Sequence, residues 1–396
     1  MSEKVQELFS QFMNARPIIL NRGALSISFT PRNIPHREKQ IEEIARILAP
    51  ALKGDRPSNI FIYGRTGTGK SLVSTMVTGE LGRAANGHRI RVIYANCKMR
   101  HSADTEYRLL AYLSKELGRE VPFTGLPTDQ IYSCFFSLLD KEKQTLILII
   151  DEIDTLVKKT GDEVLYNLTR INEELNNSRV CIIGITNDLG FINSLDPRVR
   201  SSLSEEELIF PPYNAMQLRD ILKARAEIAF REETVGDGVI EKCAALAAQE
   251  HGDARRALDL LRVSAEIAER QGDEAISIKH VDHAEEKIDM DRTLETIKAQ
   301  PKQSKAVLYS IIQLSEKQRN INTGDVLELY QENCRRAGIK CLTQRRISDL
   351  IAELDLFGII TTKVISRGRY GRTRTINLAL SGPITKKVKN VLEQIF

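Results

Sequence analysis

One octapeptide constrains this chain more than any other feature of its sequence. It reads Gly64-Arg65-Thr66-Gly67-Thr68-Gly69-Lys70-Ser71 and matches the spacing G-x-x-x-x-G-K-[ST]. An apolar run at residues 60–63 precedes it and a helical run at residues 72–81 follows it, which is the context that the motif requires. A chance glycine-rich turn would need neither neighbour. The octapeptide therefore predicts a loop between a strand and a helix that binds phosphate groups.

The residues of this loop predict a site for ATP or ADP with Mg²⁺. Its glycines let the backbone curl so that N–H groups point at phosphate oxygens. Lys70 is expected to reach the β- and γ-phosphates, and the Ser71 hydroxyl is expected to ligate Mg²⁺. The residues expected to contact the nucleotide are Gly64, Thr66, Gly67, Thr68, Gly69, Lys70, Ser71 and Leu72.

The pattern around this loop predicts an α/β domain over residues 31–210. Short apolar runs at residues 60–63, 91–94, 146–150 and 180–185 alternate with helical stretches. Continuous runs of this kind are typical of parallel strands buried on both faces. Residues 1–30 read as an irregular N-terminal extension, and a helix is predicted over residues 37–51.

Two carboxylates follow the run at residues 146–150. Asp151 is expected to hold Mg²⁺, and Glu152 is expected to polarise the attacking water. An Asp-Glu pair alone is a weak signal, but after a phosphate-binding loop it is a strong one. Asp154 is expected to cap the helix that follows.

A polar residue also ends the next strand. In P-loop ATPases of the AAA+ type, a side chain at this place senses the γ-phosphate, and Asn187 fits that role. The alternative is an asparagine that only begins a turn into Asp188-Leu189-Gly190.

Two arginine-containing motifs complete the predicted site. Leu195-Asp196-Pro197-Arg198-Val199-Arg200-Ser201-Ser202 lies where AAA+ proteins present an arginine finger to a neighbouring subunit. Arg198 is favoured over Arg200, and a surface ion pair is the alternative. Gly252-Asp253-Ala254-Arg255-Arg256-Ala257-Leu258 opens a helix in the manner of a sensor 2 motif, in which Arg255 is favoured and Arg256 stays open.

Charge is distributed unevenly along the chain. Residues 301–396 carry 17 Lys and Arg against 8 Asp and Glu, whereas residues 1–300 carry 40 against 45. A basic C-terminal quarter suggests a polyanionic partner, and a solvated surface is the alternative. The six cysteines form no C-x-x-C pair, which favours reduced thiols. No run of eighteen apolar residues and no signal peptide occur, so a cytoplasmic location without membrane contact is expected.

The C-terminal pattern predicts two all-helical or mostly helical parts. Residues 211–299 read as an all-α lid, and residues 300–396 read as a winged helix. The third helix of the latter follows Thr343 as N-cap and places Ile347, Leu350, Ile351 and Leu354 on one face. Gln344, Arg345 and Arg346 then face outward, towards a DNA major groove.

Between the two final predicted strands lies a short arginine-rich turn. Its four arginines and one tyrosine have no acidic neighbour, and they are expected to lie along a DNA backbone or minor groove. These residues are Arg367, Arg369, Tyr370, Arg372 and Arg374. The alternative is a hairpin that only aids solubility.

Several of these stretches together resemble the archaeal Orc/Cdc-type replication initiators. They are Ile34-Pro35-His36-Arg37-Glu38, Val121-Pro122-Phe123-Thr124-Gly125-Leu126, residues 195–202, Phe210-Pro211-Pro212-Tyr213, residues 252–261 and Arg367-Gly368-Arg369-Tyr370-Gly371. The resemblance covers almost the whole chain in the order of that family. Ser71 stands where many relatives have threonine, which keeps the hydroxyl group.

The resemblance implies a protein that binds duplex origin DNA and helps to recruit the MCM replicative helicase, as a slow ATPase that acts as a switch. It implies a nucleoid-associated protein with paralogues or further copies of itself as partners on DNA. It also implies that Tyr213 and Arg225 touch the nucleotide and that the segment before Arg37 lies near adenine. An insertion over residues 97–118 would meet DNA through Lys98, Arg100 and Arg108.

Two other functions fit parts of the pattern. A clamp-loader ATPase shares the ATPase motifs and the lid, but is expected to lack a basic wing. A transcription regulator could use the winged helix and keep the ATPase as a sensing module.

Overall fold

We analysed a computed structural model of the chain, which describes residues 16–26, 29–31, 33–85, 88–98, 103–122, 125, 127–317, 321–366 and 372–396. Of residues 364–366 and 372–373 it describes the backbone. The chain forms two compact units, Met1–Asp282 and His283–Phe396. The boundary between them falls within one helix, α12 (Ile278–Ala299).

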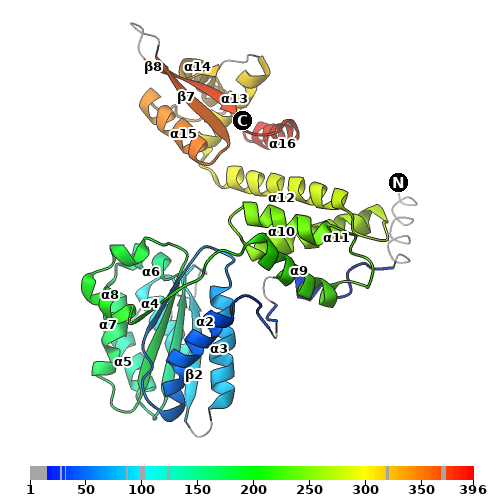
Figure 1. Cartoon of the computed structure of the whole chain (residues 1–396). Coiled ribbons are helices and arrows are strands. Elements are labelled where there is room, and N and C mark those ends of the chain that lie inside the picture. The colour runs from blue at the N-terminus through cyan, green and yellow to red at the C-terminus, as the bar shows by residue number, and fades with distance from the viewer. Residues whose placement is uncertain are drawn as a thin grey trace. The chain divides into compact units, whose positions relative to one another are not determined.

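A parallel sheet forms the centre of the first unit (Figure 1). Its order in the described part of the chain is β2-β3-β4-β1-β5, and every neighbouring pair is parallel. The strands are β1 (Ile60–Tyr63), β2 (Ile90–Asn96), β3 (Thr145–Asp151), β4 (Arg179–Thr186) and β5 (Glu206–Ile209). The register pairs Tyr63 with Thr186 and Asp151 with Ile185, so the carboxyl ends of the three central strands meet at one edge.

Helices cover both faces of this sheet, because alternate residues of each strand are buried on opposite sides. On β3, Ile147 and Ile149 pack with α2 and α3, whereas Leu146, Leu148 and Ile150 pack with α4 to α8. The helices are α2 (Glu38–Leu48), α3 (Lys70–Ala84), α4 (Glu106–Glu116), α5 (Thr128–Leu139), α6 (Ile153–Thr160), α7 (Glu163–Arg170) and α8 (Pro197–Leu203).

The helical part of the first unit follows β5. It contains α9 (Ala215–Ala229), α10 (Val239–Gln249) and α11 (Ala254–Gln271), with α9 opened by a capping box between Asn214 and Gln217. The chain's own N-terminal segment lies on it, since the Glu269 carboxylate accepts the N–H groups of Ile18 and Ile19, both at 3.0 Å.

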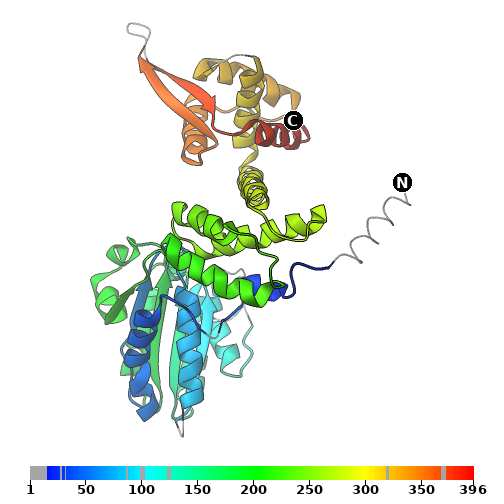
Figure 2. The same cartoon turned by 45° about the vertical axis from the view of Figure 1, so that its right-hand side comes forward.

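The second unit has the helices and the three-stranded antiparallel sheet expected of a winged helix (Figure 2). Its helices are α13 (Lys302–Lys317), α14 (Thr323–Arg336), α15 (Gln344–Leu356) and α16 (Gly382–Glu393), and its sheet has the order β6-β8-β7, from β6 (Ile321–Asn322), β7 (Ile360–Ser366) and β8 (Arg372–Leu378). The predicted face of α15 is buried: Ile347, Leu350, Ile351 and Leu354 all belong to the core of this unit.

The predicted fold class is confirmed, with two differences in detail. Strand β5 was not predicted, because its sequence, Glu206-Glu207-Leu208-Ile209, has one buried residue and lies at the sheet edge. The prediction for Asp154 is wrong: α6 begins at Ile153 with Glu152 at the N-cap, and the Asp154 carboxylate instead accepts the Thr186 hydroxyl at 2.8 Å. Every helix among the described residues is too short or too polar to span a bilayer. The domain boundaries at residues 210/211 and 299/300 stay predictions.

Candidate functional site

The phosphate-binding loop links β1 to α3, and its glycines have the geometry that a close approach to the backbone needs. Gly67 and Gly69 have φ of 69° and 91°, which disfavours any residue with a Cβ atom. At Gly64, a Cβ atom would lie 2.3 Å from the Phe210 carbonyl oxygen. The loop therefore has no room for side chains at these three positions, and its N–H groups precede the N-terminus of α3.

Lys70 is buried at the first turn of α3. Its ammonium group donates to the carbonyl oxygens of Gly64 and Arg65, both at 2.7 Å, and to Asn187 Oδ1 at 2.8 Å. Burial lowers the pKa of Lys70 to about 8, and the nearby Asp151 carboxylate opposes this shift. Three hydrogen bonds thus hold the ammonium group against the loop, and a bound phosphate would have to replace at least one of them.

The end of β3 supplies the oxygen atoms of a candidate Mg²⁺ site. Ser71 Oγ donates to Asp151 Oδ2 at 2.6 Å, so a hydroxyl and a carboxylate meet beside the loop. Hard oxygen donors of this kind suit Mg²⁺, which binds proteins through one or two such ligands together with nucleotide phosphates. The two predicted ligands are therefore close enough to serve one ion.

Glu152 follows with a left-handed backbone, φ 56° and ψ 41°, which is uncommon for a residue other than glycine. Its N–H group donates to Asp151 Oδ1 at 2.9 Å. Such backbone strain is found at functional sites, where it fixes the direction of a side chain. The Glu152 charge also acts on the Lys70 ammonium, so the two side chains share one electrostatic environment.

The helical part of the unit reaches the loop through the start of α11. The Asp253 carboxylate caps this helix by accepting the Arg255 N–H at 2.8 Å, and it lies against Gly67. The Ala254 N–H donates to the Gly67 carbonyl at 3.2 Å. Arg255 is exposed, and its positive charge acts on Lys70, whereas Arg256 is largely buried and pairs with Glu250 at 3.1 Å. Of the two arginines, Arg255 is therefore the exposed one whose charge acts on Lys70.

Arg37 is a residue of this site that no motif of the P-loop type predicts. Its guanidinium donates to the Thr68 carbonyl at 2.9 Å and to the Pro211 carbonyl at 2.5 Å. It also lies 3.9 Å from the centre of the Tyr213 ring. Burial lowers the pKa of Arg37, with Tyr213 opposing the shift. Arg37 joins the loop to the segment that leads into α9. The sequence signal that could have indicated Arg37 is its place in Ile34-Pro35-His36-Arg37-Glu38, one of the stretches that carry the family resemblance.

Tyr213 and Arg225 were both expected at the nucleotide, and their described contacts differ. The Tyr213 hydroxyl lies beside Gly69, 3.0 Å from the place of a Cβ atom. Arg225 instead donates to the carbonyl oxygens of Ala24 and Phe29, both at 3.2 Å, and its guanidinium stacks 4.5 Å from the Phe29 ring. Its described contacts are with the N-terminal segment rather than with the loop.

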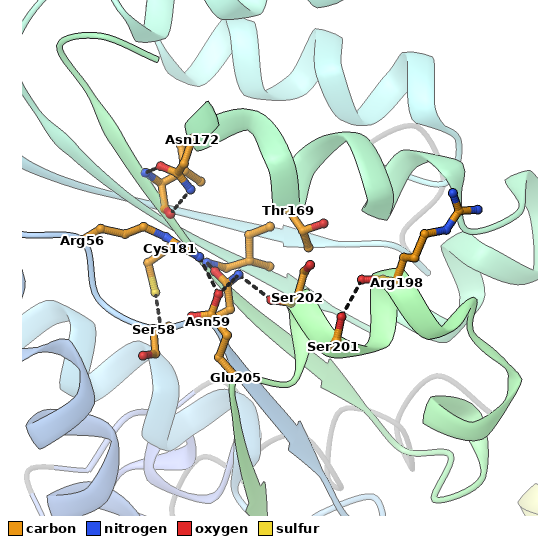
Figure 3. A network of polar contacts seen from close by, with 12 residues as sticks. Arg56, Ser58, Asn59, Thr169, Asn172, Cys181, Arg198, Ser201, Ser202 and Glu205 are labelled. Carbon is orange, nitrogen blue, oxygen red and sulfur yellow. Dashed lines mark hydrogen bonds and ion pairs between the residues drawn. The ribbon is translucent and has the colours of Figure 1, made fainter. Parts of the chain in front are cut away.

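Arg198 projects from the start of α8, with a side chain 68% exposed. It pairs with Asp196 at 3.1 Å and lies 5.5 Å from the Tyr166 ring. Figure 3 shows its guanidinium pointing away from a polar network at the other end of α8. In that network, Asn59 donates to the Ser202 carbonyl at 2.8 Å and accepts the Ile182 N–H at 2.8 Å. The network fixes α8 to the sheet, and Arg198 lies at the other end of this helix.

A cavity of about 430 Å³ lies beside this network. It is lined by Arg56, Thr169, Arg170, Asn172, Glu173, Arg179, Ser202 and Glu205. These residues flank the amino ends of β1, β4 and β5, the opposite edge of the sheet from the loop. Ligands of parallel α/β sheets bind at the carboxyl ends of the strands, so this cavity is not the nucleotide site.

Of the candidate DNA-contacting residues of the first unit, Arg108 lies in α4 and Lys98 follows β2. Lys98 is exposed, and Arg108 pairs with Asp104 at 2.8 Å, an acid that Lys159 of α6 also contacts at 3.2 Å. Arg100 lies outside the described residues. The structure thus ties Arg108 to the ATPase core through a shared carboxylate.

In the second unit, the outward face of α15 carries Gln344, Arg345 and Arg346, all exposed. Arg346 lies 3.4 Å from Glu353, and Arg374 of β8 donates to the Ser348 carbonyl at 3.3 Å. Arg374 therefore brings the strand of the wing next to the start of α15. Arg367, Arg369 and Tyr370 lie outside the described residues, as does the side chain of Arg372.

Comparison with known protein families identifies three parts of the chain. Family models match three segments: "ATPase family associated with various cellular activities (AAA)" over residues 60–212, "Cdc6 AAA+ ATPase-type lid domain" over residues 219–286, and "CDC6, C terminal winged helix domain" over residues 295–388. Together they confirm the predicted order of an AAA+ domain, a lid and a winged helix.

Relatives match over nearly the full length. The ORC1-type DNA replication protein of Pyrococcus furiosus is 53% identical over 396 residues, covering 98% of this chain and 93% of that protein. The protein of the same name from Thermococcus onnurineus is 50% identical over 394 residues, covering 98% and 94%. The solved structure of the Aeropyrum pernix ORC1 protein in complex with DNA is 44% identical, with a TM-score of 0.82, and covers 94% of this chain and 97% of that one. The resemblance seen in the sequence is confirmed, and the chain belongs to the family of archaeal ORC1-type DNA replication proteins.

Proposed function

We propose that this protein is an ATP-dependent replication initiator that binds duplex origin DNA and helps to recruit the MCM helicase. The observation that carries the proposal is the joining, in one chain, of a complete phosphate-binding site to a winged helix with exposed basic residues on α15. The related Aeropyrum pernix ORC1 protein was solved in complex with DNA, which supports the same activity here. Acting on DNA, the protein would be associated with the nucleoid.

ATP binding is proposed to set the shape of the initiator on DNA, with slow hydrolysis as the reset. Lys70 would bind phosphate oxygens, and Ser71 and Asp151 would hold Mg²⁺, which neutralises phosphate charge when bound. Glu152 and Asn187 would orient the attacking water, and Arg255 would respond to the γ-phosphate from the lid. Arg198 would act on a nucleotide held by a neighbouring copy or a paralogue on DNA.

Tyr213, beside Gly69, and Arg225 are proposed to contact the nucleotide. The hydrogen bonds of Arg225 also support a role in holding the N-terminal segment to α9. DNA phosphates are proposed to contact Lys98, Arg100 and Arg108 in the insertion and Arg367, Arg369, Arg372 and Arg374 in the wing, and Tyr370 is proposed to stack on sugar. Base edges are proposed to meet Gln344, Arg345 and Arg346.

The test is nuclease footprinting on DNA from the protein's own genome, with ATP, with ADP and without nucleotide. We expect protection confined to a few duplex sites near replication origins. Arg345→Ala should weaken that protection, and Arg335→Ala, which removes an exposed arginine from α14, should leave it unchanged. Uniform protection of all duplex DNA, or protection confined to promoters, would contradict the initiator function.

A further inference from the structure

A tyrosine of the neighbouring strand touches the candidate Mg²⁺ site. The Tyr94 hydroxyl of β2 donates to Asp151 Oδ2 at 2.6 Å. The register of β2 and β3 places Tyr94 opposite Ile149, two residues before Asp151. Residues two apart on a strand share one face, so Tyr94, Ile149 and Asp151 lie on the α3 side of the sheet. Tyr94 is 37% exposed and is thus not explained as part of the apolar core.

Three donors together hold the Asp151 carboxylate. Oδ1 accepts the Glu152 N–H at 2.9 Å, and Oδ2 accepts both the Ser71 hydroxyl and the Tyr94 hydroxyl, each at 2.6 Å. Ser71 and Glu152 already have roles in the proposed function, Ser71 as a Mg²⁺ ligand and Glu152 as a residue that orients water. Tyr94 is the donor that adds a constraint from a different strand, β2.

Tyr94 is itself held by helix α4. The Tyr112 hydroxyl donates to the Tyr94 carbonyl oxygen at 3.0 Å. Strand β2 is the last strand on its side of the described sheet, so its ladder with β3 fixes it from one side. The bond from Tyr112 adds a second attachment from the other helical layer, since Tyr112 packs against the core that α4 shares with β3.

We propose that Tyr94 is a positioning residue for Asp151, and that α4 holds Tyr94 in place through Tyr112. Groups that hydrogen-bond a metal ligand orient it, and their loss typically costs 10–100-fold in metal affinity. Removal of the Tyr94 hydroxyl would leave the carboxylate with two donors, the Ser71 hydroxyl at the start of α3 and the Glu152 N–H at the end of β3. The inference rests on the proposed function, because it takes Ser71 and Asp151 as the Mg²⁺ ligands.

The test compares nucleotide affinity with and without Mg²⁺ in the full chain. A fluorescent ATP analogue is titrated in excess Mg²⁺ and again in EDTA. The Kd in EDTA divided by the Kd in Mg²⁺ gives the factor by which the metal increases affinity. For Tyr94→Phe we expect this ratio to fall roughly tenfold while the Kd in EDTA is unchanged. For Tyr112→Phe we expect a smaller fall of roughly threefold, since it loses one neutral hydrogen bond.

Tyr107→Phe is the matched control. Tyr107 also lies on α4 and its hydroxyl also donates to a backbone carbonyl, that of Pro122 at 2.9 Å, but this carbonyl is not on β2. We expect its ratio of Kd values to equal that of the wild type. Equal thermal melting curves for the three variants would show that the differences do not come from misfolding.

The outcomes separate this inference from the proposed function. If the wild type binds the analogue equally well in Mg²⁺ and in EDTA, the metal site of the proposed function is wrong. If the wild type gains affinity from Mg²⁺ and Tyr94→Phe gains as much, the positioning role of Tyr94 is overturned while the metal site stands. A wild-type ratio for Tyr112→Phe would overturn the part assigned to α4.

Discussion

The Lys70 ammonium lies 2.8 Å from the side-chain oxygen of Asn187, so the phosphate-binding loop and the end of β4 share a hydrogen bond. The two residues are 117 positions apart in the sequence. They meet because β1 and β4 are neighbours and their carboxyl ends are in register. A phosphate group bound by Lys70 would therefore also lie near the Asn187 side chain.

Replacement of Lys70 tests the loop. Lys70→Ala should weaken ATP binding by about a hundredfold, because it removes charge-assisted contacts worth about 3 kcal/mol. Fluorescence titration with an ATP analogue measures the change. Lys39→Ala removes an exposed lysine from α2 and serves as control. Unchanged ATP affinity in Lys70→Ala would refute the assignment of the loop.

Replacement of Glu152 separates binding from hydrolysis. Glu152→Gln keeps the shape of the side chain and removes its charge, so ATP affinity should stay within about twofold while phosphate release falls by about 10²–10⁴-fold. Single-turnover phosphate release and equilibrium binding give the two quantities. Normal hydrolysis in this variant would exclude Glu152 from the reaction.

Replacement of each of the two lid arginines should have a different effect, one on hydrolysis and the other on stability. Arg255→Ala should lower the hydrolysis rate roughly ten- to hundredfold without changing the melting temperature, because the side chain is exposed and its charge acts on Lys70. Arg256→Ala should destabilise the protein by about 1–3 kcal/mol, because its side chain is 10% exposed and pairs with Glu250. Melting curves and hydrolysis rates of both variants decide between them, and the reverse pattern would assign the sensor role to Arg256.

The wing is tested by salt dependence. Arg369→Ala should weaken duplex binding and reduce the slope of log K against log salt by about 0.9, the value for one lost phosphate contact. Binding is measured by fluorescence anisotropy at four or more salt concentrations. Lys387→Ala, an exposed lysine of α16, is the control. An unaltered slope for Arg369→Ala would count against a phosphate contact.

Gly252 tests the packing of the turn before α11 against the segment that leads into α9. Its φ is 71°, and a Cβ atom would lie 2.3 Å from the Tyr213 carbonyl oxygen. Gly252→Ala should therefore destabilise the protein by about 1–3 kcal/mol. Gly79→Ala, in the open middle of α3, should stabilise it by about 0.5–1 kcal/mol. Thermal melting of both variants is the measurement. Equal changes in melting temperature would show that the backbone around Gly252 relaxes to accommodate a Cβ atom.

Local patterns predicted most of the fold. Strand β1 has the predicted bounds, and the buried face of α15 follows from apolar residues at helical spacing. Strand β5 lacks this signal, because two of its four residues are exposed glutamates. Its place beside β1 comes from pairing of Ile60 with Glu206, a long-range contact that composition does not encode.

For the site, motifs brought together the residues that share one edge of the sheet, Lys70, Asp151 and Asn187. They did not predict Tyr94 or the bonds of Arg37, since each depends on a partner from a different element. The contacts of Arg225 show the same limit. The family resemblance implies that Arg225 touches the nucleotide, which stays a prediction, and no motif indicates its hydrogen bonds to Ala24 and Phe29, about two hundred positions earlier.

The buried guanidinium of Arg37 has a mechanical consequence. One cation holds both a carbonyl of the phosphate-binding loop and a carbonyl of the segment where the lid begins. A motion of the lid that displaces the Pro211 carbonyl therefore has to carry Arg37 along and pull on Thr68, or first break one of the two hydrogen bonds. A phosphate-binding loop stiffened by its ligand would then also resist the motion of this segment.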